Sequence, residues 1–159
     1  MSVHQFNDLV SQFLAAEKLG RVRPRWRTVG HPEYAVAKLT VSAPNSRVLV
    51  GVVRLTAHKI RQPPKYSFAL TFRGQRLLAL DVNPARNHTN LFVRESVGGT
   101  HWQRWPHMEA ETDARAQAFA AWLRDFLRAG NVVTTFGVLS PPRGMQLELF
   151  HGRKGTNAR

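Results

Sequence analysis

The fold is decided by residues 66–82, Tyr-Ser-Phe-Ala-Leu-Thr-Phe-Arg-Gly-Gln-Arg-Leu-Leu-Ala-Leu-Asp-Val. Apolar residues occupy every second position from Tyr66 to Phe72, which is typical of a strand with one buried face. Gly74 and Gln75 are expected to turn the chain, and Arg76–Val82 to return as the next strand. This stretch therefore predicts an antiparallel pair at the centre of a sheet.

Further strands are expected on both sides of this pair. Tyr34–Ala43 and Arg47–Ala57 are rich in β-branched and aliphatic residues and flank a Pro-Asn-Ser turn. The second of these, rich in Val and Leu, is expected to be a central strand buried on much of both faces. Downstream, the sequence predicts a hairpin of Leu91–Glu95 with His101–Trp105, a strand at Val132–Leu139, and an edge strand or docking motif at Met145–Leu149.

Two amphipathic helices are expected. The first is predicted over Ser2–Leu19, because Ser2 and Gln5 have capping-box spacing and apolar residues recur every three or four positions. The second is predicted over Thr112–Ala129, with Thr112 as its N-cap and Gly130 as its end.

These elements indicate an α+β fold. We expect a curled antiparallel sheet of about seven to nine short strands, a half-barrel, with the two helices packed on it. The length of 159 residues suits a single domain over residues 1–150, followed by a basic disordered tail at 151–159.

The charge predicts the class of partner. The chain has 23 Lys and Arg against 10 Asp and Glu, a net charge of +13. A surplus of this size favours a polyanionic partner, most often nucleic acid. A GC-rich genome would explain the preference for Arg over Lys but not the shortage of acidic residues.

The expected setting is the cytoplasm. The chain has no cysteine, its first residues do not resemble a signal peptide, and no apolar run approaches the ~20 residues that span a bilayer. No membrane partner is therefore expected.

Arginine occupies every second position from Arg21 to Arg27. In an extended chain these side chains share one face, at a spacing close to that of phosphates along a strand. Pro24 predicts an edge strand or an arm, so the same charges could instead protect an edge from aggregation. The expected nucleic-acid-binding residues are Arg21, Arg23, Arg25, Arg27, Lys59, Arg61, Lys65, Arg94 and Trp102.

Residues 81–105 hold the candidate active centre. His88 and His101 could act as general base and general acid on RNA, while Arg86 and Arg104 stabilise charge on phosphorus. Alternatively, both histidines are structural. A metal site using Asp81 and the two histidines is less favoured, because the spacing matches no compact ligand motif, so no metal or cofactor is expected.

The segments 80–84 (Leu-Asp-Val-Asn-Pro), 88–90 (His-Thr-Asn) and 99–102 (Gly-Thr-His-Trp) resemble a signature of small uncharacterised bacterial proteins, some associated with mobile elements. The resemblance covers about a sixth of the chain. Members of that family usually carry another histidine where this chain has Gln103, and the resemblance implies no particular reaction.

The sequence thus predicts a cytoplasmic nucleic-acid-binding protein that favours RNA over DNA. It could be a small metal-independent endoribonuclease of the toxin kind. The alternative is a non-enzymatic inhibitor or adaptor, such as a phage or mobile-element antagonist of a nucleic-acid-binding host defence complex.

Overall fold

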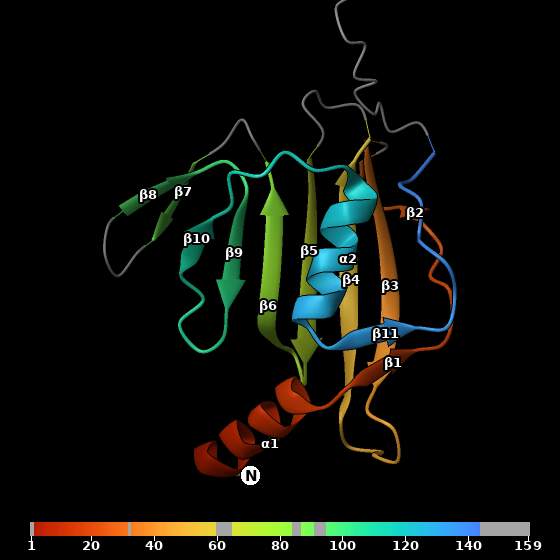
Figure 1. Cartoon of the computed structure of the whole chain (residues 1–159), viewed down its shortest axis with the longest axis vertical. Helices are drawn as coiled ribbons and strands as arrows, with labels where there is room; N and C mark the ends of the chain where they lie inside the picture. The colour runs from red at the N-terminus through yellow and green to blue at the C-terminus, as the bar shows by residue number, and fades with distance from the viewer. Residues whose placement is uncertain (1, 32, 60–64, 84–86, 91–94, 144–159) are drawn as a thin grey trace, which may run out of the picture.

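The computed structural model describes residues 2–31, 33–59, 65–83, 87–90 and 95–143 (Figure 1). Its elements in chain order are α1 (Val3–Ala15), β1 (Lys18–Gly20), β2 (Arg27–Thr28), β3 (Tyr34–Ser42), β4 (Val50–His58), β5 (Lys65–Phe72), β6 (Gln75–Val82), β7 (Asn87–Asn90), β8 (Glu95–Gly98), β9 (His101–Arg104), β10 (Ala110–Thr112), α2 (Phe119–Ala129) and β11 (Val132–Thr134).

One open sheet organises the molecule. Its strand order is β10-β9-β6-β5-β4-β3-β1-β11, with β2 paired to β3 beside this path. The long strands β3 to β6 are consecutive antiparallel neighbours, as the alternating sequence predicts. The α+β class is confirmed, but β11 pairs with β1 in parallel, so the sheet is not purely antiparallel.

Alternation along the strands gives the sheet one apolar face, which α2 covers (Figure 1). On β5, Phe68 and Leu70 are fully buried, whereas the alternating residues Ser67, Ala69 and Thr71 are half-exposed. The ring of Phe126 on α2 lies 5.6 Å from that of Phe68. The opposite face carries polar side chains on β3 and β4, including Lys38 and Arg54, which stand opposite each other in the register.

Helix α1 lies at one end of the sheet (Figure 1). The predicted capping box of Ser2 with Gln5 is confirmed in both directions. Phe13 stacks on Phe72 with ring centroids 4.4 Å apart, which anchors the helix to β5. The helix ends at Ala15, and the buried ammonium of Lys18 donates to the carbonyls of Phe13 and Ala16, each at 2.6 Å.

The second helix begins later than the sequence predicts. Thr112 lies in β10, where it pairs with His101 of β9, and α2 starts only at Phe119 with no side-chain cap. The next residue, Asp113, binds other groups: its carboxylate accepts from the indole N–H of Trp102 and from the guanidinium of Arg115.

Four further expectations about the strands need correction. Leu91–Arg94 lie outside the described residues, but the hairpin predicted for them with His101–Trp105 is wrong, because β9 pairs with β6 on one side and β10 on the other. Strand β4 is central but is buried on one face only. The strand predicted at Val132–Leu139 ends at Thr134, and the first helix does not reach Leu19, which lies in β1. Met145–Leu149 and the tail at 151–159 lie outside the described residues.

Candidate nucleic-acid interface

The arginine-rich segment forms one wall of a groove rather than a continuous strand. Residues 21–26 leave the sheet after β1, and Pro24 interrupts any ladder of hydrogen bonds there. Only Arg27 and Thr28 pair with an edge, opposite Val36 and Ala35 of β3. The strand geometry predicted for the whole segment is therefore realised only at its end.

The segment at 139–143, after β11, forms the other wall. Side chains of the arginine-rich segment bind the backbone of this wall and of the residue before it. The indole N–H of Trp26 donates to the Ser140 carbonyl at 2.9 Å, and Arg23 donates to the Val138 carbonyl at 3.3 Å. The hydroxyl of Thr135 donates in turn to the carbonyl of Arg21 at 3.2 Å. These contacts join two parts of the chain that lie about 115 residues apart in sequence.

The groove is strongly cationic. It encloses about 600 Å³, which lies within the range of ~300–1,000 Å³ typical of ligand pockets. Five cationic side chains line it, and none of its described lining residues is acidic; the cations are Arg23, Arg25, Arg27, Lys59 and Arg143. Like charges that share a concave surface focus the electrostatic potential, so the groove favours an anionic occupant.

One aromatic side chain lines the same groove. The indole of Trp26 is half-buried and lies 6.1 Å from the ring of Phe119 on α2, which fixes its orientation. Grooves that bind single-stranded nucleic acid combine cations that follow the backbone with aromatic rings on which bases stack. The groove contains both kinds of group.

The predicted binding residues divide into those that converge here and those that do not. Arg23, Arg25, Arg27 and Lys59 converge, whereas Arg21 is exposed outside the lining. Lys65 lies at the start of β5, opposite His58 of β4. Arg61, Arg86 and Arg94 lie outside the described residues.

Arg143 was not predicted as a binding residue. In the sequence it stands only in a Pro-Pro-Arg-Gly turn, far from the arginine-rich segment. The contacts of Arg23 and Trp26 with residues 138–140 bring it to the groove. No local signal in the sequence could have indicated this placement.

The prediction that Trp102 is a nucleic-acid-binding residue is wrong. Its side chain is 6% exposed, its ring stacks on Phe126 at 6.2 Å, and its indole N–H donates to Asp113. These contacts place Trp102 in the core beneath α2, where no base can reach its face.

His101 is held between two acceptors. Its Nδ1 lies 3.1 Å from the Gly99 carbonyl, which can only accept, so Nδ1 carries a proton. Its Nε2 lies 3.6 Å from Oδ2 of Asp81, an ion-pair contact longer than an ideal hydrogen bond. The Asp81 carboxylate raises the pKa of His101 above its usual range, burial opposes this effect, and the Gly99 carbonyl reinforces it.

The same contact acts on Asp81. Burial alone would raise the pKa of this carboxyl, but interactions with His101 and Ser67 outweigh it and lower the pKa below the usual range. The pair therefore favours a charged imidazolium beside a carboxylate, buried on the histidine side. Because Asp81 and His101 stand opposite each other in the register, this ion pair links β6 to β9.

Among the other predicted catalytic residues, the structure describes the side chain of Arg104 only, and it does not lie beside His101. Arg104 is three positions away on β9, so its side chain leaves from the opposite face of the strand. There it lies over the Trp102 ring and pairs with Glu111 at 2.7 Å. The backbone of His88 pairs with Val97 in the separate β7–β8 sheet, and its side chain lies outside the described part of the chain.

Across the residues that the structure describes, no group of three or more His, Cys, Asp or Glu is placed to hold a metal ion. Within those same residues, no helix is both long enough and apolar enough to cross a bilayer.

Comparison with known protein families, with curated proteins and with solved structures finds no match to this chain.

Proposed function

We propose that this protein binds single-stranded nucleic acid, with RNA favoured, in the groove between residues 23–28 and residues 139–143. The observation that carries the proposal is the convergence of five cations, without an acidic residue, on one groove. A phosphate backbone supplies a row of negative charges that such a groove would neutralise, with release of counterions.

An unpaired strand suits the groove better than a duplex. Duplex DNA is read by convex elements, such as helices, that enter its grooves, whereas this surface is concave and is partly walled by an indole ring. Sequence-specific recognition of RNA mostly targets unpaired loops and ends whose bases are free to stack. RNA is therefore the first ligand to test, with DNA of the same sequence beside it.

The test is a charge reversal with a matched control. Arg25 and Arg27 are exposed in the groove, so their double replacement by Glu should weaken binding of a labelled 12-nucleotide RNA by tenfold or more. The control reverses Lys38 and Arg54, exposed on the polar face of the sheet, and should leave affinity nearly unchanged. Equal losses in the two proteins would show that net charge, rather than the groove, drives binding.

The ribonuclease hypothesis stays a separate prediction. We expect any cleavage of labelled RNA by wild-type protein to persist in EDTA, and His88→Ala to abolish it. Absence of cleavage by wild type would remove the enzymatic hypothesis and leave RNA binding untouched.

A further inference from the structure

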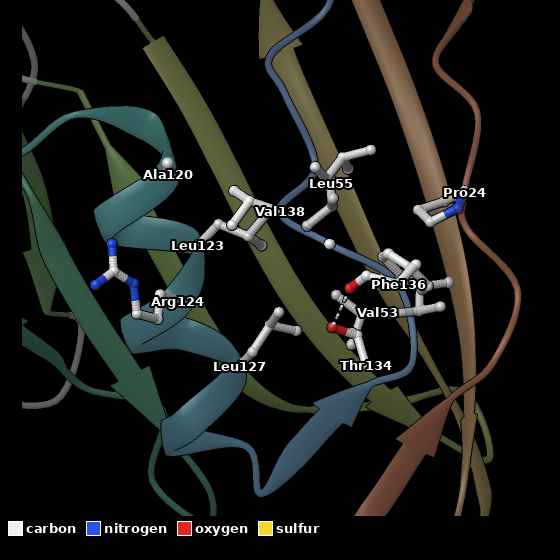
Figure 2. Close-up of a pocket in the computed structure, with 13 residues that line it drawn as sticks. Pro24, Val53, Leu55, Ala120, Leu123, Arg124, Leu127, Thr134, Phe136 and Val138 are labelled. Atoms are coloured by element: carbon white, nitrogen blue, oxygen red, sulfur yellow. Dashed lines mark hydrogen bonds between the residues drawn. The ribbon is translucent and has the colours of Figure 1, made fainter.

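An apolar cavity lies between α2 and the sheet, next to the basic groove. It encloses about 280 Å³. Figure 2 shows α2 on one side, the strands behind, and the segment that follows β11 passing across the front. Its apolar walls include Leu39, Val53 and Leu55 of the sheet, Leu123 and Leu127 of α2, and Val138.

The chemistry of the walls selects an apolar occupant. An apolar cavity of roughly 150 Å³ stays dry and binds benzene, so this one is large enough for a chain on the order of ten carbon atoms. The hydroxyl of Thr134 is already used, because it donates to the Phe136 carbonyl at 3.2 Å. Arg124 is the other polar side chain among the described lining residues, and it is exposed to solvent, so water held here would find few buried partners.

The cavity adjoins the groove. Pro24 and Leu139 line both spaces. Arg23 and Arg25 stand on either side of Pro24 and line the groove. A molecule with its apolar part against Leu55 and Leu123 would therefore have cations beside its other end.

We propose that cavity and groove together bind a single-chain amphipathic anion: a medium-length alkyl chain in the cavity and a carboxylate or phosphate head among the groove arginines. The apolar walls account for the chain, and the charge of the groove accounts for the head. This site goes beyond nucleic-acid binding and does not rest on it, because its apolar half has no part in holding a phosphate backbone.

The test uses three probes on the full chain, measured by isothermal titration calorimetry below their aggregation concentrations. Decanoate should bind one to one. Decan-1-ol, which keeps the chain and lacks the charge, should bind about fivefold more weakly, as expected for loss of a solvent-exposed ion pair. Acetate, which keeps the charge and lacks the chain, should show no binding.

Variants then locate the site. Ala120 on α2 lines the cavity, and Ala120→Leu should lower decanoate affinity tenfold or more by filling space that the alkyl chain needs. Ala129→Leu adds the same side chain at an exposed position at the end of the helix and should bind like wild type. Leu127→Phe, a second cavity-filling change, serves if Ala120→Leu does not fold by circular dichroism.

Two results would overturn the proposal. One is the absence of decanoate binding to wild type. The other is unchanged decanoate affinity in a folded cavity-filling variant. RNA binding depends on the groove cations and Trp26, none of which lines the cavity. A folded Ala120→Leu protein should therefore keep its RNA affinity, so failure of this proposal and failure of the nucleic-acid proposal are distinguishable.

Discussion

Salt dependence should report how many groove cations contact phosphates. Each phosphate contact on a single strand contributes about −0.7 to the slope of log affinity against log salt concentration, so the five groove cations together predict about −3.5. At that slope, raising salt from about 50 to about 200 mM should lower RNA affinity on the order of a hundredfold.

The perturbation removes two of these cations, one from each wall. The double change Arg25→Gln and Arg143→Gln leaves three cations and should reduce the slope to about −2. Over the same range of salt, affinity should then fall only on the order of twentyfold. Neutral glutamine is preferred to glutamate here, because it removes phosphate contacts without adding repulsion.

The assay is fluorescence anisotropy of a labelled oligonucleotide, titrated with protein at four or more salt concentrations. The control is Lys38→Gln with Arg54→Gln, which lowers net charge equally on the polar face of the sheet. The control should keep the wild-type slope. Equal slopes for wild type and the groove variant would refute the reasoning, and a flat dependence for wild type would favour the alternative of a shaped protein–protein interface.

Three further predictions concern the scaffold. Lys18→Met should lower the free energy of unfolding by about 2–4 kcal/mol, because the carbonyls at the end of α1 would lose the buried ammonium that donates to them. In urea denaturation, a loss of stability no larger than that of the exposed control Lys38→Met would contradict this role of Lys18 in capping the helix. Gly51→Ala should lower the free energy of unfolding by about 1–3 kcal/mol in the same assay, because a Cβ there would meet Phe13 at 2.5 Å and the Thr71 carbonyl at 2.6 Å. Unchanged stability would show that Phe13 and the backbone at Thr71 can move to make room. Asp81→Asn should destabilise the folded protein most near pH 5 and less near pH 8. The raised pKa of His101 contributes stability that is lost as pH rises through that pKa, whereas the lowered pKa of Asp81 contributes stability that is lost only in stronger acid. A stability difference that does not change with pH would mean that the two side chains are not coupled.

Local pattern was enough to predict the centre of the fold. Residues 66–72 alternate because one face of β5 is covered by α2, and the period of two reflects that burial directly. Likewise, the capping box at Ser2 is a contact over three residues, which the sequence can encode alone.

Contacts between residues far apart in the sequence could not be predicted from local patterns. Thr112 has the chemistry of a helix cap, yet pairing with His101 draws it into β10. Strand β9 pairs with β6 and not with Leu91–Glu95, the nearby segment that the sequence suggested. Strand β11 pairs with β1, more than a hundred residues away in the sequence. These choices depend on tertiary burial, which outweighs local propensity.

In the candidate site, too, local patterns were predictable and long-range contacts were not. The alternating arginines predicted a cationic surface, and Arg23, Arg25 and Arg27 do line one groove. Arg143 joins them in the groove because Trp26 binds the backbone of Ser140, near the end of the described chain. A contact between residues so far apart in the sequence leaves no local pattern. Conversely, His101 looked suited to catalysis because the sequence did not show that Asp81 and the Gly99 carbonyl engage both of its nitrogens.

The most direct test of the central claim is a map of backbone amide NMR signals during titration with a single-stranded RNA. The largest shifts should cluster in the two walls, at residues 23–28 and 139–143, together with Lys59, and they should weaken at high salt. Shifts centred instead on β7 and β8, or spread evenly over the basic surface, would contradict the assignment of the groove as the site of binding.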